Sequence, residues 1–127
     1  MNPISLSDGE WKIMNHLWDK APQTIMELTA GLQEETGWDK HTVITMLGRM
    51  EKKGAVSYET QGRTKQFYPL VSKNEVCIQE TKGFLNKVYC GSIGMMVNAM
   101  VKNQQLSAQD IQELYDILNQ AEKAQKD

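Results

Sequence analysis

The sequence of 127 residues lacks the long apolar runs and cysteine clusters that mark several large classes of protein. Its longest apolar stretches are far shorter than the roughly 20 residues that cross a bilayer, so we expect no membrane insertion. Its two cysteines, Cys77 and Cys90, form no CxxC pair and have no histidine nearby, which excludes a zinc-finger pattern and a disulfide framework. We therefore expect neither a metal nor another cofactor.

Motifs of catalysis are also missing. The sequence has no HExxH, no glycine-rich phosphate loop, no paired acidic motif and no Ser/His/Asp order. The first residues, Met1 to Ser7, are neither basic nor apolar, unlike a signal peptide. We therefore expect a cytoplasmic protein that is not an enzyme.

Positive charge is scarce overall but is concentrated in one segment. The formal net charge is −2 and the isoelectric point is about 5.7. Residues 40–65 nevertheless carry +4, whereas residues 1–39 carry −5 and residues 66–127 carry −1. Because phosphates are neutralised locally, a basic segment suits a nucleic acid even in an acidic chain.

Two helices are predicted before the basic segment. Ser7 and Glu10 form an S-x-x-E capping box, and Thr24 and Glu27 form a second one, which Gly37 follows as a C-terminal glycine. We place the helices at residues 7–19 and 24–37. Their expected buried residues recur at helical spacing and are Trp11, Met14, Leu17, Trp18, Ile25, Leu28 and Leu32.

A third helix and a β-hairpin are predicted across the basic segment. Asp39 can cap the helix and Gly54 can end it, around an apolar stripe of Val43, Met46, Leu47 and Met50. The pattern then changes to a period of two, which predicts strands at residues 55–60 and 64–70 with Gly62 at a positive φ. Three helices followed by a hairpin are typical of a winged helix-turn-helix domain.

The remaining chain is predicted to be helical, at residues 76–89, 92–102 and 107–123. These helices have too little apolar bulk for a core of their own, so we expect them to pack against a second copy of the chain. The expected fold is mostly α with a small β-hairpin: a winged helix-turn-helix DNA-binding domain at 1–71 and a C-terminal helical dimerisation domain at 72–127. The expected dimer interface comprises Phe84, Leu85, Val88, Met96, Ile111, Leu114, Ile117 and Leu118.

Double-stranded DNA is the expected partner of the basic segment. A recognition helix presents short polar side chains to base edges at its N-terminal end, while longer basic residues reach phosphates. A threonine hydroxyl pairs with several base edges, and a threonine methyl or Ile44 can contact a thymine methyl. At the hairpin tip, Arg63 can enter the minor groove or clamp the backbone, with Lys65 beside it. The expected contacts are Lys40, His41, Thr42, Ile44, Thr45, Arg49, Lys52, Lys53, Arg63 and Lys65.

Two other interpretations of these residues remain open. Paired lysines at a helix end also occur on ordinary solvated surfaces, where they complement the helix dipole. A winged helix can also serve as a protein-interaction module without nucleic acid. The combined order of helix, hairpin and local charge favours DNA, and salt-dependent DNA retention separates the two functions.

The sequence resembles the penicillinase-repressor and methicillin-resistance-regulator family, the BlaI/MecI type, over nearly its whole length. The resemblance rests on residues 10–18 (EWKIMNHLW), 42–54 (TVITMLGRMEKKG), 67–69 (FYP), 84–91 (FLNKVYCG) and 110–118 (DIQELYDIL). It implies a homodimeric repressor on palindromic operators ahead of β-lactamase-type genes. It also implies release by proteolysis in the dimerisation helices, triggered by a membrane β-lactam sensor with a protease domain.

The chain departs from the family at the cutting site and in the recognition helix. The family is typically cut at an Asn-Phe bond, whereas alignment here places the bond between Ala99 and Met100, with Asn98 one residue earlier. His41 and Ile44 stand where the family is commonly basic and polar. These departures leave the operator and the inducer open, and an orphan repressor of unrelated genes is the alternative.

Overall fold

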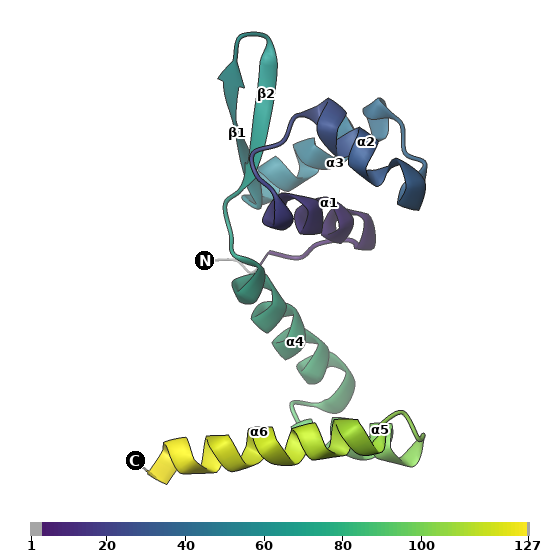
Figure 1. Cartoon of the computed structure of the whole chain (residues 1–127), viewed down its shortest axis with the longest axis vertical. Coiled ribbons are helices and arrows are strands. Elements are labelled where there is room, and N and C mark those ends of the chain that lie inside the picture. Colours follow the sequence, from purple (N-terminus) through teal and green to yellow (C-terminus); the bar gives the residue numbers. More distant parts are fainter. Residues whose placement is uncertain (1–3, 127) are drawn as a thin grey trace. The chain divides into compact units, whose positions relative to one another are not determined.

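The computed structural model describes residues 4–126 and confirms a mostly helical fold with one β-hairpin (Figure 1). None of the helices described is long and apolar enough to cross a bilayer. The chain forms two compact units, divided between residues 81 and 82. The elements are α1 (Asp8–Asp19), α2 (Ile25–Thr36), α3 (Lys40–Lys53), β1 (Val56–Gln61), β2 (Thr64–Pro69), α4 (Lys73–Tyr89), α5 (Ile93–Lys102) and α6 (Ala108–Lys126).

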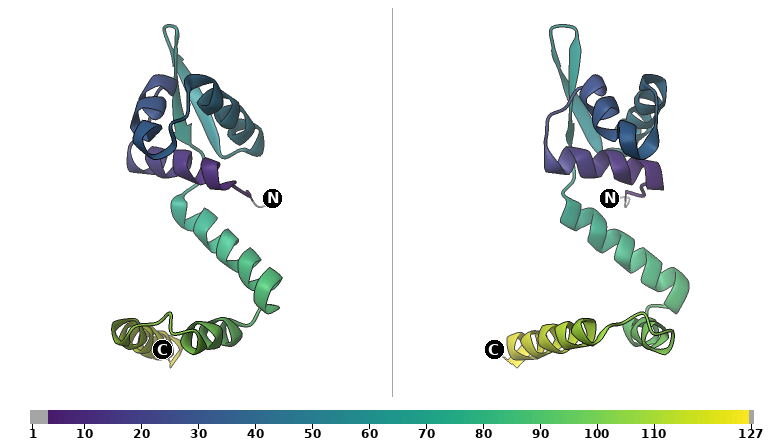
Figure 2. Two further views of the ribbon diagram at one scale, coloured as in Figure 1. Left: turned by 90° about the vertical axis from the view of Figure 1, so that its right-hand side faces the viewer. Right: turned by 45° about the vertical axis from the view of Figure 1, so that its right-hand side comes forward.

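The first unit is a three-helix cluster packed against the base of the hairpin (Figure 2). Helices α1, α2 and α3 contact one another, while α1 and α2 contact β2 and α3 contacts β1. Gln23 forms an antiparallel bridge with Phe67 and so ties the segment before α2 to the outer edge of β2. The core consists of Leu6, Ile13, Met14, Leu17, Leu28, Leu32, Val43, Leu47, Met50, Ala55, Val56, Phe67 and Val76.

The capping boxes begin α1 and α2 as predicted. The Glu10 amide donates to Ser7 Oγ at 3.2 Å, and the Glu27 amide donates to Thr24 Oγ1 at 3.1 Å. The face that α1 buries differs from the prediction, because Ile13 takes a core position and Trp18 is only half-buried. Trp18 lies at the margin of the core, where its indole N–H donates to a backbone carbonyl at 2.9 Å.

Three of the four strand ends in the hairpin differ from the prediction by one residue. Gln61 pairs with Thr64, so the turn has two residues, and Gly62 adopts a φ of 62° as expected. A two-residue turn requires such backbone conformations, which glycine adopts without strain. Arg63 therefore lies at the tip of the hairpin.

Helix α4 begins earlier than predicted. Ser72 caps it, because the Glu75 amide donates to Ser72 Oγ at 3.1 Å and the hydroxyl donates to the Glu75 carboxylate. Val76 in the first turns is buried in the core of the first unit. The two compact units consequently divide inside α4, later than the boundary we expected between residues 71 and 72.

The second unit contains the end of α4 with α5 and α6. Ser92 caps α5, and Ser107 and Asp110 cap α6 reciprocally. No residue of α5 is fully buried, and many apolar side chains of this unit are exposed. Cys90 is exposed and adopts a positive φ of 52°.

Candidate nucleic-acid interface

Local hydrogen bonds fix both ends of α3. The Thr42 amide donates to Asp39 Oδ1 at 2.9 Å, and this hydrogen bond holds the pKa of Asp39 below its usual value. At the other end Gly54 adopts a left-handed conformation with a φ of 82°. The helix therefore begins and ends where the sequence predicted, and its first turn presents Lys40, His41 and Thr42 to solvent.

The buried and exposed faces of α3 separate as the apolar stripe predicted. Val43, Leu47 and Met50 are fully buried, whereas Met46 is half-buried. The predicted DNA-facing residues of the helix are all exposed, and they are Lys40, His41, Thr42, Ile44, Thr45, Arg49, Lys52 and Lys53. These side chains are accessible to a ligand, except for Lys53, whose ammonium contacts Glu10 and Ser5.

The exposed face of α3 has a concave side of about 430 Å³ lined by residues of this helix and its cap. Thr45 lies there, and its hydroxyl donates to the His41 carbonyl at 2.9 Å. Because its one proton is used in this bond, the Thr45 hydroxyl is left as an acceptor toward an outside ligand. The lining residues are Asp39, His41, Thr42, Thr45, Met46 and Arg49.

A second concave surface, which we call the cationic cleft, joins α3 to α2 and the hairpin. It has a volume of about 610 Å³, and it is lined by Thr24, Ile25, Met26, Lys40, Ile44, Arg63, Thr64 and Lys65. Three of these side chains are cationic, and none of the described lining residues is acidic. Residues far apart in the sequence thus form one positively charged surface beside the exposed face of α3, which favours a polyanionic ligand.

The hairpin holds its two cations in different ways. The Lys65 ammonium lies 4.5 Å from the centre of the Tyr58 ring, a cation–π contact that keeps the lysine against β1. Arg63 is exposed in the turn, beside Gly62. The Tyr58 ring therefore holds the Lys65 ammonium in place along the hairpin. Arg63 carries a second positive charge farther out, at the tip of the hairpin.

Lys52 and Lys53 occupy different environments, although the sequence suggested one role for both. Lys52 is exposed, whereas the Lys53 ammonium bonds to the buried Glu10 carboxylate and to the Ser5 carbonyl. Burial by itself raises the pKa of Glu10, but its hydrogen bonds from Lys53 and the Ser7 amide outweigh this effect and lower it. Lys53 therefore has a structural role, and Lys52 remains a predicted phosphate contact.

Comparison with known proteins identifies the family. The profile of the family described as penicillinase repressor matches residues 6–120. The chain belongs to this family. It is 32% identical to the methicillin resistance regulatory protein MecI of Mammaliicoccus sciuri over 90% of this chain and 93% of the relative, and 31% identical to the penicillinase repressor of Bacillus licheniformis over 96% and 95%.

A solved structure of this family supports the winged-helix fold of the first unit. The monomeric form of Bacillus licheniformis BlaI, in complex with the blaP half-operator, is 29% identical. The match has a TM-score of 0.51 and covers 59% of this chain and 93% of that one. The penicillinase repressors are transcriptional regulators, so this member is a repressor and not an enzyme.

Sequence reasoning missed the part of the cationic cleft that α2 contributes. Thr24, Ile25 and Met26 form the start of α2, and a helix leaves its first amides without partners inside the helix. The capping box of Thr24 and Glu27 was the available signal, because it marked this helix start. The start of α2 lines the same cleft as Lys40 and Arg63 only because of how the whole unit packs.

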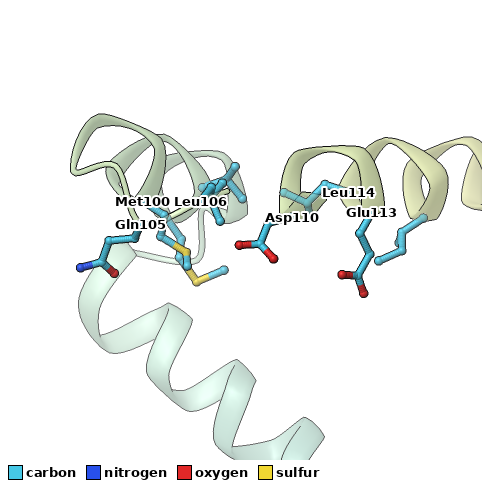
Figure 3. A pocket seen from close by; sticks show the side chains of 9 residues that line it. Met100, Gln105, Leu106, Asp110, Glu113 and Leu114 are labelled. Atoms are coloured by element: carbon cyan, nitrogen blue, oxygen red, sulfur yellow. The ribbon is translucent and has the colours of Figure 1, made fainter. Parts of the chain in front are cut away.

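In the second unit of this repressor, the predicted interface residues are mostly exposed. Phe84, Val88, Ile111, Ile117 and Leu118 are 40 to 62% exposed, and Leu85, Met96 and Leu114 are half-buried. A groove of about 380 Å³ is lined by residues of α5, α6 and the segment between them, which include Met100, Leu106 and Leu114 and the acidic Asp110 and Glu113 (Figure 3). At the predicted cutting site in α5, Asn98 is exposed, whereas Ala99 and Met100 are half-buried.

Proposed function

We propose that this protein is a cytoplasmic homodimeric repressor that binds palindromic operator DNA ahead of genes for β-lactam resistance. Proteolysis in its second unit ends repression. The observation that carries the proposal is the cationic cleft beside the exposed face of α3. The names of its relatives, a methicillin resistance regulator and a penicillinase repressor, supply the class of genes.

In the proposed complex, α3 lies in the major groove. His41, Thr42 and Thr45 face base edges, because they occupy the exposed N-terminal half of the helix. Arg49 and Lys52 reach phosphates on one side. On the other side Lys40, Arg63 and Lys65 hold the backbone that passes the hairpin, and Arg63 has the reach to enter the minor groove.

Dimerisation supplies the affinity that a single DNA-binding unit, here called a head, lacks. The exposed apolar residues of α5 and α6 bury their surface against the same helices of a second copy. Once one head is bound, the second meets its half-site at a high effective concentration. The two half-sites are then expected about one helical turn, or a multiple of it, apart.

Cutting between Ala99 and Met100 removes this advantage without altering the DNA-binding surface. The bond lies in α5, where no residue is fully buried, so local opening of the helix costs little packing energy. The protease would belong to a membrane sensor of β-lactams. Mass spectrometry of the repressor from β-lactam-treated cells should then find a fragment that ends at Ala99.

A salt titration of DNA binding tests the proposal. The full chain is mixed with a duplex from the promoter next to a β-lactamase-type gene, between 50 and 200 mM salt. If each head neutralises about four phosphates, a dimer neutralises about eight, and log affinity falls with log salt at a slope of about −7. Sedimentation of the same sample should give a dimer. A monomer with salt-independent retention would contradict the proposal and favour a protein-interaction module.

A promoter test separates a resistance repressor from an orphan repressor. Deletion of the gene for this protein should raise transcription of a β-lactamase-type gene in the absence of any antibiotic. If DNA binding is strong but the derepressed genes are unrelated to β-lactams, the chain is a repressor with another signal.

A further inference from the structure

Two large apolar side chains are exposed in the cationic cleft. Met26 at the start of α2 is 74% exposed, and Ile44 in α3 is 40% exposed. Single exposed apolar residues are ordinary on protein surfaces. These two, however, line the same concave surface as Lys40, Arg63 and Lys65. Exposed apolar side chains and cations thus line one concave surface on the face that we propose for DNA.

The fold of the first unit does not require an apolar residue at position 44. The neighbouring Val43 is fully buried, whereas Ile44 lies on the exposed face of α3. A polar residue there would be hydrated without cost to the core. An isoleucine side chain has no donor or acceptor, so it cannot select a base by a hydrogen bond.

The surrounding charge indicates which ligand covers this surface. The three lysine and arginine side chains of the cleft favour a polyanion, and B-DNA in its major groove presents one apolar group on its base edges, the C5 methyl of thymine. Opposite any other base edge, Ile44 would remove water from polar atoms without replacing their hydrogen bonds, which is unfavourable.

We infer that Ile44, with Met26 beside it, recognises thymine methyl groups in the operator. The inference rests on the proposed DNA-binding function and adds a specificity to it. Thr45, whose hydroxyl proton is already bonded to the His41 carbonyl, is left as an acceptor and selects an amino group of adenine or cytosine. The two neighbouring residues therefore read different chemical groups.

Replacement of thymine by uracil isolates the contact, because it removes the methyl and leaves every hydrogen-bonding group of the base in place. The probes are duplexes that the wild-type protein selects from a random pool, with each thymine then replaced singly by uracil. Binding to wild type should weaken about three- to tenfold at one or two positions in each half-site, the effect expected for one buried methyl.

Two variants assign the effect to a side chain. Ile44→Gln keeps a good helix former and removes the apolar contact, so it should bind thymine and uracil duplexes equally at those positions. Ile78→Gln is the matched control. Ile78 is 46% exposed in the first unit but does not line the cleft, so this variant should keep the wild-type preference for thymine. Circular dichroism should show unchanged helix content in both.

Three results would overturn the inference. If wild type selects duplexes but binds every uracil substitution as well as thymine, the methyl is not recognised and the DNA-binding function stands. If Ile44→Gln keeps the thymine preference, another residue reads the methyl. If wild type selects no duplex at 50 mM salt, the DNA-binding function fails and the inference fails with it.

Discussion

The ammonium of Lys53, at the end of α3, lies 2.5 Å from the carboxylate of Glu10, which is only 3% exposed and caps α1 at the same time. The same ammonium also donates to the Ser5 carbonyl at 2.8 Å. One cation thus joins α3, α1 and the segment before α1. Its neighbour Lys52 makes no such contact and is exposed.

This difference predicts opposite effects for two adjacent substitutions. Lys53→Met should lower the free energy of unfolding of the first unit by about 1 to 3 kcal/mol, because it leaves the buried Glu10 carboxylate without its cation. Lys52→Met should leave stability within about 0.5 kcal/mol and weaken DNA binding. Urea unfolding and a binding titration measure the two effects, and equal stability loss in both variants would contradict the assignment.

Acid should weaken the same contact. The pKa of Glu10 is lower in the folded chain than its ordinary value of 4.5, so the carboxylate contributes stability above that pH. This contribution is lost as the pH falls below about 4.5 and through the lowered pKa, as the carboxylate takes up a proton. Urea unfolding between pH 7 and pH 3 should show a smaller fall in stability for Glu10→Gln than for wild type. The capping carboxylates Glu27 and Asp39, whose pKa values are also lowered, remain in both proteins and serve as the common background.

The two arginines are predicted to act in DNA binding and not in folding. Arg49→Ala and Arg63→Ala should each weaken operator binding by about 1 to 3 kcal/mol and make the salt slope about one unit shallower. Lys12→Ala is a suitable control, since Lys12 lies in α1 and forms a surface ion pair with Glu35. Electrophoretic mobility shifts at several salt concentrations measure all three. Unchanged affinity in both arginine variants would refute the proposed interface.

The apolar residues of α6 are predicted to join two copies of the chain. Leu114→Glu or Ile117→Glu should give monomers with weak DNA binding, because a buried unpaired carboxylate is costly in an apolar interface. Asn119→Glu, at an exposed position of the same helix, should remain dimeric. Analytical ultracentrifugation distinguishes these results. A stable dimer from both interface variants would move the interface elsewhere.

The starts of α1, α2 and α3 could be predicted from the sequence because their signals are local. The capping box of Ser7 and Glu10, the cap Asp39 and the end at Gly54 each depend on residues within one turn. Ser72 and Glu75 carry an equally local signal, the S-x-x-E spacing that marks the start of α4. The apolar stripe of α3 was also sufficient to identify its exposed face.

Contacts between distant residues could not be predicted in the same way. Lys53 and Glu10 are 43 positions apart, so nothing in the last turn of α3 showed that one lysine of the pair is engaged by a buried carboxylate. The position of Met26 beside Arg63 depends on how the bridge between Gln23 and Phe67 ties the start of α2 to the hairpin. Such positions follow from packing of the whole unit.

The burial of Val76 makes the start of α4 an integral part of the DNA-binding head. Trp18 strengthens this attachment through its hydrogen bond to the Val71 carbonyl. A chain severed in α5 would therefore leave a folded, monovalent head that competes for single half-sites. The speed with which a cell resumes transcription would then depend on how fast it degrades or dilutes this remnant, in addition to how fast the bond is cut.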